Sequence, residues 1–234
     1  MRLIGLLGGM SWESSAEYYR LANELVRERV GGLASARLLL HSVDFAEVER
    51  LQAADRWDEA GALLATAAAG LEAGGAELLV LCTNTMHKVA PAIEAAVSIP
   101  LLHIGDVTAR AVRAAGLARV GLLATSYTME QDFLRERLAG HGLTVLVPDG
   151  DDRAVVHRII YEELCLGVVT EESRQAYRDV IVRLVDAGAE GVILGCTEIE
   201  LLVSQEDSSV PVFASTALHA QAAVDFALAD QPVR

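Results

Sequence analysis

The sequence is poor in positive charge. Nineteen Lys and Arg residues stand against 33 Asp and Glu residues, giving a formal net charge of −14. A protein that binds the phosphates of nucleic acid or an anionic membrane needs a basic surface. The composition therefore argues against nucleic acid and against an anionic membrane surface as partners. Hydrophobic residues make up 52% of the chain, which is enough to build a sizeable core.

Cysteine is also scarce. The chain has Cys82, Cys165 and Cys196, and no two of them form a Cys-x-x-Cys pair. Three isolated cysteines exclude a disulfide framework. Free thiols are typical of a reducing compartment, so the sequence predicts a cytoplasmic protein.

Long apolar runs are missing as well. No stretch approaches the about 20 apolar residues of a membrane helix. The apolar start of the chain, residues 3–7, is short, and Glu13 and Glu17 follow soon after it. This start predicts a first strand, and we do not interpret it as a signal peptide.

Motifs for cofactors and metals are absent. The run Gly5-Leu6-Leu7-Gly8-Gly9 lacks the Gly-x-Gly-x-x-Gly spacing of a dinucleotide site, and we expect a tight turn whose backbone can also approach a small anion. The chain also lacks a Gly-x-Ser-x-Gly sequence, the turn that carries the nucleophile of many serine hydrolases. The histidines show no metal-ligand spacing and are expected to be structural, with His87 the nearest to the site: His41, His87, His103, His141, His157 and His219. We expect no cofactor and no metal.

The most informative pattern in the sequence occurs twice. Residues 76–85 and 189–198 both begin Ala-Glu, continue with a mostly apolar run and end in small polar residues. Such a run, bounded by glycine, predicts a buried parallel strand. The alignment of the two copies places Thr83 on Cys196. Residues 2–9 also resemble residues 119–126 at a similar spacing.

The repeat predicts the fold class. We expect an α/β protein with two similar parallel-sheet domains related by a pseudo-twofold axis. Two short proline-containing links, at residues 99–102 and 210–213, would be the crossovers. The first domain is then residues 1–98 plus 212–234, and the second is residues 99–211. Because ligands gather at the carboxyl ends of parallel strands, the site is expected in the cleft between the domains.

The sequence contains only a few signals for where helices begin. Residues 41–52 have the composition of a polar turn region. Asp55 is expected to cap a helix with Ala60, Leu64 and Leu71 on its apolar face. Thr170 is expected to cap a later helix whose first turn carries Glu171.

Cys196 and Thr83 are the candidate reactive residues. Cys196 follows a glycine at a predicted strand end, where a nearby helix N-terminus would lower the pKa of its thiol. The alternative is a buried structural cysteine. Thr83 could instead begin a helix as its N-cap residue. Cys82 precedes Thr83 on the strand, points to the opposite face and belongs to the core.

Two polar groups facing one ligand suit a specific reaction. One group removes a proton from one face of a carbon atom, and the other adds a proton to the opposite face. Hydrogen-bond donors between the two groups would stabilise the enolate-like charge.

The chain resembles the aspartate/glutamate racemase family over essentially its whole length. It looks closest to the bacterial L-aspartate/glutamate-specific and broad-specificity amino-acid racemases. The stretches that carry the resemblance are residues 5–14, 39–45, 82–88, 127–133, 162–167 and 195–198. The resemblance implies two α/β domains and cofactor-independent racemisation by two acid/base groups. It also implies a carboxylate-bearing amino acid as substrate and a homodimer.

Roles follow from the resemblance residue by residue. Cys196 matches one of the two acid/base thiols of the family, and Thr83 occupies the place of the other. The remaining positions are expected to line the site and hold the substrate: Met10, Ser11, Gln52, Asn84, Thr85, Thr197 and Glu198.

The chain departs from the family pattern at two positions. Thr83 stands where the family usually has cysteine, and Cys165 stands where it usually has a carboxylate-binding lysine. A threonine hydroxyl is a poor base, so Thr83 is expected to relay protons. Arg50 is a candidate replacement for the lysine. Two alternatives stay open: a dicarboxylate isomerase or decarboxylase of the same fold, and an amino-acid binding protein that has lost catalysis.

Overall fold

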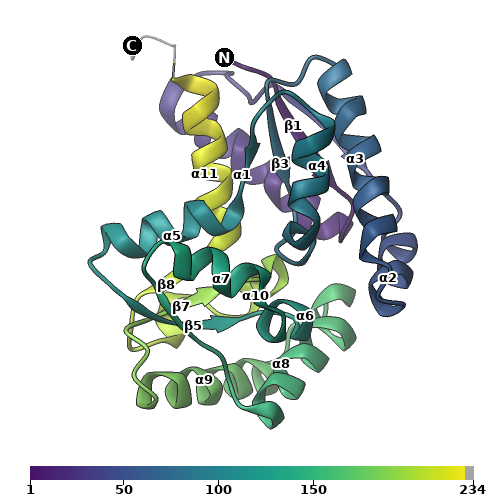
Figure 1. The fold of residues 1–234 in the computed structure, drawn as a ribbon. Helices are drawn as coiled ribbons and strands as arrows, with labels where there is room; N and C mark the ends of the chain where they lie inside the picture. The colour runs from purple at the N-terminus through teal and green to yellow at the C-terminus, as the bar shows by residue number, and fades with distance from the viewer. Residues whose placement is uncertain (230–234) are drawn as a thin grey trace. The chain divides into compact units, whose positions relative to one another are not determined.

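The computed structural model describes residues 1–229 and shows a regular alternation of strands and helices (Figure 1). The strands are β1 (Ile4–Gly8), β2 (Leu38–Ser42), β3 (Leu78–Leu81), β4 (Leu101–Leu102), β5 (Arg119–Leu123), β6 (Thr144–Leu146), β7 (Gly191–Leu194) and β8 (Val212–Ala214). The α-helices are α1 (Trp12–Val30), α2 (Phe45–Ala53), α3 (Trp57–Ala73), α4 (Ala90–Ala96), α5 (Ile104–Ala114), α6 (Ser126–Glu130), α7 (Asp132–Gly140), α8 (Gly150–Glu162), α9 (Glu171–Asp186), α10 (Thr197–Leu202) and α11 (Ser215–Leu228). Three short 3-10 helices complete the elements: η1 (Thr85–Val89), η2 (Leu164–Leu166) and η3 (Gln205–Asp207).

The strands form two four-stranded parallel sheets with the same strand order. The first sheet runs β2-β1-β3-β4, and the second runs β6-β5-β7-β8. In each sheet the two central strands pair in parallel, as in Ile4 with Leu78 and Val120 with Gly191. The predicted fold class of two parallel α/β domains is confirmed.

In the first unit, both faces of the sheet are covered by helices. Leu7, Leu79 and Leu81 pack on one face in a core with residues of α2, α3 and α4. Ile4 and Val80 pack on the other face with residues of α1 and α11. Figure 1 shows these two helices on the same side of β1 and β3. Because successive residues of a strand point to opposite faces, continuous apolar strands are what a sheet covered on both sides requires.

The second unit is built in the same way around one large core. Its strands pack against α9 and α8 on one side and against α5 and α7 on the other (Figure 1). Gly121 in β5 makes this packing possible, because a Cβ atom there would lie 2.9 Å from Leu184 Cδ1 of α9. Gly5 has the same place in β1, where a Cβ atom would lie 2.9 Å from Ala76 Cβ.

The repeated Ala-Glu pair has a structural role in each unit. Glu77 Oε1 accepts a hydrogen bond from Leu3 N at 3.0 Å, just before β1 begins. Glu190 Oε2 accepts hydrogen bonds from Ala118 N and Arg119 N at 2.9 Å, where β5 begins. The preceding glycine has a positive φ in both copies and ends the helix before it. The repeat therefore fixes the start of each central strand.

The two compact units have boundaries that differ from the predicted ones. The first consists of residues 1–103 together with those from His219 onward, and the second of residues 104–218. The proline links are not crossovers between the units, because each continues into the last strand of its own sheet. Leu101 pairs with Leu79 and Phe213 pairs with Ile193. Residues 230–234 of the predicted first domain lie outside the described residues.

Two local predictions were wrong. Residues 45–53 form α2, with Asp44 as its N-cap, and do not form a polar turn region. Asp55 does not cap α3: it has a positive φ, and its carboxylate accepts a hydrogen bond from the indole of Trp57. By contrast, the predicted cap at Thr170 is confirmed, since Thr170 Oγ1 accepts from Ser173 N at 3.1 Å.

Candidate functional site

The two strand-end motifs occupy the same place in their sheets. Thr83 lies two residues after the end of β3, and Cys196 lies two residues after the end of β7. β3 and β7 are the third strands in the two equivalent strand orders. Each unit therefore presents one polar motif at the carboxyl end of a central strand, which is where ligands gather in parallel sheets.

In the second unit, Cys196 lies beside a carboxylate. The residue is partly exposed at the N-cap position of α10, and its thiol donates a hydrogen bond to Glu198 Oε2 with 2.9 Å between the atoms. Thr197 and Glu198 are buried. The hydroxyls of Thr197 and Thr216 lie 3.0 Å apart. These contacts hold the thiol, a carboxylate and a hydroxyl together at one strand end.

The pKa of Cys196 differs from the prediction in its direction. Burial raises the pKa of the thiol well above its ordinary value, and the negative charge of Glu198 raises it further. The predicted lowering by the helix N-terminus was wrong, because α10 is a short helix of 6 residues and a carboxylate lies next to the sulfur. The thiol is therefore protonated at rest and needs a group that accepts its proton.

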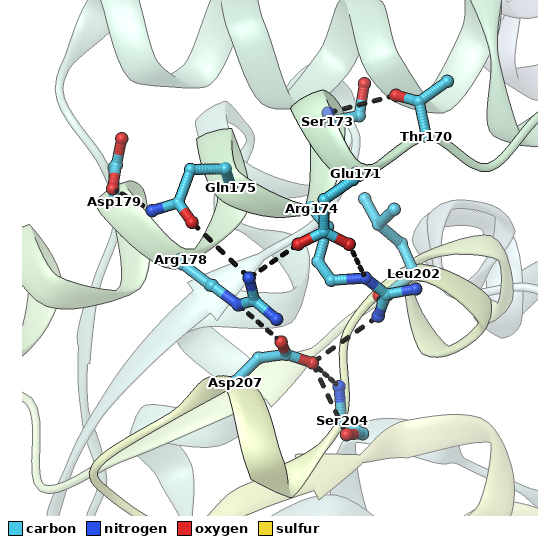
Figure 2. Close-up of polar contacts among 10 residues, drawn as sticks. All are labelled: Thr170, Glu171, Ser173, Arg174, Gln175, Arg178, Asp179, Leu202, Ser204 and Asp207. Carbon is cyan, nitrogen blue, oxygen red and sulfur yellow. Dashed lines mark hydrogen bonds and ion pairs between the residues drawn. The ribbon is translucent and has the colours of Figure 1, made fainter.

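The far end of α10 is held by an ion-pair network, which Figure 2 shows. The guanidinium of Arg174 donates a hydrogen bond to the carbonyl oxygen of Leu202, the last residue of α10. Asp207 accepts from Arg178 Nε at 2.7 Å and from Ser204 N at 2.8 Å, and it lies 3.7 Å from Arg174 Nη1. The network connects α9 to α10 and to η3, the two helical segments that follow Cys196.

In the first unit, the backbone around Thr83 is held on both sides. Thr83 N donates to Leu81 O at 2.9 Å, and Thr83 O accepts from His87 Nδ1 at 2.7 Å. The preceding carbonyl, of Cys82, accepts from Ser14 Oγ at 3.1 Å. The Thr83 side chain is partly exposed. Asn84 and Thr85 are buried, and Asn84 makes no side-chain cap to the 3-10 helix η1.

Two other predicted site residues lie with this segment. Gln52 is buried on α2, and its Nε2 lies 2.8 Å from the sulfur of Met86 in η1. Its Oε1 is buried without a hydrogen-bond partner among residues 1–229. Met10 packs in the same apolar core as Met86. The fold thus brings Gln52 to the strand-end segment that carries Thr83, and Met10 belongs to the same core.

The turn after β1 is more constrained than the sequence suggested. Gly9 N donates to Ser15 Oγ at 2.7 Å, so this N–H is not available to an anion. Gly9 has φ of +93°, and a Cβ atom there would lie 2.2 Å from Val43 O, so only glycine fits. Ser11 is the N-cap of α1, and its hydroxyl accepts from Ser14 N at 3.2 Å.

Arg50 and the cysteines other than Cys196 lie in different environments. Arg50 is exposed on α2, two residues from the buried Gln52. Cys165, in η2, lies close enough to Cys196 to contribute to the raised pKa of that thiol. Cys82 is fully buried, burial raises the pKa of its thiol, and it belongs to the core of the first unit as predicted.

Several supporting residues have no direct signal in the sequence. Arg174, on α9, is distant in sequence from the α10 carbonyl that it binds. Glu200 accepts from Thr216 N at 2.8 Å at the start of α11. Tyr177 is fully buried, and this burial raises the pKa of its hydroxyl, with a further rise from the nearby Glu163. Glu200 is the exception, because it lies four residues after Cys196 and so close to a predicted site residue in the sequence.

The comparison with known families identifies the chain. The family model described as Asp/Glu/hydantoin racemase matches residues 7–223. The chain belongs to this family. The resemblance predicted from the sequence is therefore confirmed.

Solved and curated racemases of the family are similar over most of their length. A crystal structure of a Yersinia pestis protein, provisionally assigned as an Asp/Glu racemase, is 56% identical, with 97% of this chain and 100% of that chain covered and a TM-score of 0.92. An aspartate racemase homologue from Pyrococcus horikoshii is 35% identical, with 97% and 99% covered and a TM-score of 0.86. The broad-specificity amino-acid racemase RacX of Bacillus subtilis is 25% identical, with 74% of this chain and 75% of that protein covered.

These relatives place the chain among isomerases, and the predicted enzyme class is confirmed.

Two further features hold for residues 1–229. No helix there has the length and apolar character needed to cross a membrane. In the same part of the chain, no three His, Cys, Asp or Glu side chains are grouped so that they could hold a metal ion.

Proposed function

We propose that the protein is a cofactor-independent racemase of aspartate, glutamate or a broader set of amino acids. Cys196 and Thr83 would act on opposite faces of the α-carbon. The observation that carries the proposal is the Cys196 thiol bonded to the Glu198 carboxylate at the strand end, 2.9 Å apart. A sulfur that must exchange a proton with a carbon acid needs such an acceptor beside it.

The two sides would act in different ways. Glu198 accepts the proton of the Cys196 thiol, and the resulting thiolate removes the α-proton from one enantiomer. The electron pair stays on the substrate as an enolate-like anion. The Thr83 hydroxyl gives a proton to the opposite face and is reprotonated from water, while Glu198 releases its proton to water. In the reverse direction, the Thr83 hydroxyl first loses its proton to water and its oxygen then removes the α-proton. The Cys196 thiol, which is protonated at rest because burial raises its pKa, gives its proton to the opposite face and regains one from Glu198.

Other side chains would bind the amino acid. The buried Oε1 of Gln52 lacks a partner, and a buried acceptor normally has one, so we assign it to a hydrogen of the substrate ammonium group. Met10, which belongs to the same core as Gln52's neighbour Met86, would contact the substrate side chain. Ser11, Asn84, Thr85 and Thr197 would line the rest of the site. Arg50 remains a candidate for binding a side-chain carboxylate.

The decisive test is solvent hydrogen exchange at the α-carbon. The wild-type protein, without added cofactor, is incubated in heavy water with each enantiomer of acidic and neutral amino acids. We expect deuterium at Cα and conversion to the other enantiomer. Cys196→Ala should reduce both at least about 10²-fold, whereas the matched variant Cys82→Ala removes a buried thiol of the core and should keep activity. Absence of exchange with every amino acid would rule out the proposal.

The same measurements separate the alternatives. Consumption of dicarboxylic acids with no amino-acid exchange would indicate an isomerase or decarboxylase. Thermal stabilisation by an amino acid with no turnover would indicate a binding protein. We also propose a homodimer located in the cytoplasm. The cysteines of the chain are free, which is consistent with a reducing compartment, and light scattering of the purified protein tests the dimer.

A further inference from the structure

A cluster of buried polar rings lies directly behind Thr83 in the first unit. The rings of His87 and His103 have centroids 4.5 Å apart, and those of His87 and His219 have centroids 5.9 Å apart. His87 is 2% exposed, His103 7% and His219 0%. Three histidines are rarely buried together, because each must satisfy two ring nitrogens. The cluster therefore needs a physical explanation.

The hydrogen bonds fix how the cluster is oriented. His219 Nε2 lies 2.7 Å from Leu102 O, and since a carbonyl oxygen can only accept, this nitrogen carries the hydrogen. His219 Nδ1 then accepts from the hydroxyl of Tyr18 at 2.8 Å. Burial lowers the pKa of His219 to about 3, so its ring stays neutral near neutral pH. His87 thus packs against a ring whose position and charge state are both fixed.

His87 connects this cluster to the candidate reactive residue. Its Nδ1 lies 2.7 Å from Thr83 O, so Nδ1 carries a hydrogen and donates it to that carbonyl. The N–H of Thr83 is already bonded to Leu81 O at 2.9 Å. Both polar groups of the Thr83 backbone are therefore committed. Because a β-branched side chain has few allowed rotamers on a fixed backbone, the direction of the Thr83 hydroxyl is restricted as well.

The second unit uses the matching position differently. Glu200, four residues after Cys196 as His87 is four residues after Thr83, accepts from Thr216 N at 2.8 Å. The carbonyl of Cys196 accepts from Ile199 N at 3.2 Å within its own segment. The Thr83 carbonyl thus accepts from a side chain, whereas the Cys196 carbonyl accepts from a backbone N–H.

From this geometry we infer that His87 is a positioning residue for Thr83, holding its carbonyl so that the hydroxyl points at the substrate. The inference depends on the proposed racemase function. A sulfur is large and polarisable and tolerates some displacement. A hydroxyl relay depends on a short, directed hydrogen bond, and a displacement of about 1 Å costs on the order of 10²-fold in rate.

The test compares three variants in the full-length protein. His87→Phe keeps a ring but removes the donor. His87→Asn keeps an amide N–H near the place of Nδ1. Tyr18→Phe, the matched control, removes one hydrogen bond from the same buried cluster without touching Thr83. We expect kcat to fall about 10- to 100-fold in His87→Phe with KM little changed, to recover substantially in His87→Asn, and to stay near wild type in Tyr18→Phe.

The isotope effect gives a readout that a purely structural role would not change. When the Thr83 step becomes slower, the α-deuterium effect should rise for the enantiomer whose proton leaves on the Thr83 side and fall for the other enantiomer. Equal activity loss in His87→Phe, His87→Asn and Tyr18→Phe, or unchanged isotope effects, would overturn the inference.

Amide hydrogen exchange of the peptide spanning residues 82–88 separates this inference from the proposed function. It should become faster in His87→Phe and not in Tyr18→Phe, whether or not the protein racemises the amino acids tried. Slow exchange in His87→Phe would mean that His87 does not hold the segment. Faster exchange in a protein without racemase activity would refute the proposed function and leave the anchoring of Thr83 supported.

Discussion

At the scale of the residue, the two strand ends differ in how a proton can move. Cys196 has a carboxylate at 2.9 Å that can accept its hydrogen. Thr83 has its carbonyl bonded to a buried histidine instead. A thiol is intrinsically far more acidic than an aliphatic hydroxyl, and Cys196 also has a proton acceptor beside it, so the cysteine side is suited to abstraction and the threonine side to relay.

Replacing Glu198 tests the electrostatics of Cys196 directly. The carboxylate raises the pKa of the thiol, so Glu198→Gln should lower that pKa. We expect the pH midpoint of Cys196 alkylation by iodoacetamide to move down by about one unit. Mass spectrometry of the Cys196 peptide follows this residue alone. Racemase activity should fall at the same time, because the proton acceptor is lost.

The control for this variant is Glu172→Gln, which removes the same charge from an exposed position on α9. It should leave the alkylation profile of Cys196 unchanged. A midpoint that stays in place in Glu198→Gln, or moves equally in both variants, would show that the carboxylate does not act on the sulfur.

At the scale of the element, α10 is too short to be stable by itself. A helix of 6 residues forms only where its ends are held, since nucleation is costly. Its first end carries Cys196, and its last carbonyl is bound by Arg174 from α9. The ion pairs around Asp207 in Figure 2 keep the guanidinium groups in place. Stability of this small helix therefore depends on side chains outside it.

Arg174 and Arg178 form a natural pair for testing this dependence. Both guanidinium groups contact Asp207 and Glu171, but Arg174 also binds Leu202 O. We expect Arg174→Ala to lower the free energy of unfolding by about 1 kcal/mol more than Arg178→Ala. It should also reduce kcat, because α10 positions Cys196. Urea unfolding and steady-state kinetics measure the two effects, and equal values for the two variants would argue against this role.

At the scale of the whole molecule, one sheet design is used twice with separate cores. The strand orders match, and each central strand begins where a glutamate binds its backbone. The units differ in the groups that they bury behind the strand ends. The first buries His87 and His219, and the second buries Tyr177 and Glu198. Buried ionisable groups of this kind make stability depend on pH.

Stability should fall in acid in two stages. His219 has its pKa lowered to about 3 from an ordinary 6.5, so below 6.5 only the unfolded chain takes up its proton. The free energy of unfolding should therefore decrease as pH falls below 6.5. The pKa values of Glu190 and Asp207 are also lowered, so their contribution is present above their ordinary values of 4.5 and 3.8 and is lost below them.

Urea unfolding at several pH values, from about 7.5 down to about 2.5, measures both stages. His219→Leu is less stable at neutral pH but should lose the part of the slope that lies between about pH 6.5 and 5. A wild-type stability that stays constant over that interval would show that His219 is not buried in its neutral form.

The sequence by itself determined the two-sheet fold, the strand ends and the residues at them. Apolar runs bounded by glycine occur twice with the same Ala-Glu start, and an apolar run of this length predicts a buried strand without knowledge of the rest of the fold. Cys82 was assigned to the core because strand residues alternate in direction, and it is fully buried.

Only the tertiary structure decided which groups act on these residues. The raised pKa of Cys196, the last strands supplied by the proline links, and the bonds from Arg174 and Tyr18 all depend on segments far apart in the chain. Burial and charge at a site come from every neighbour in space, and a linear sequence without the fold does not specify those neighbours.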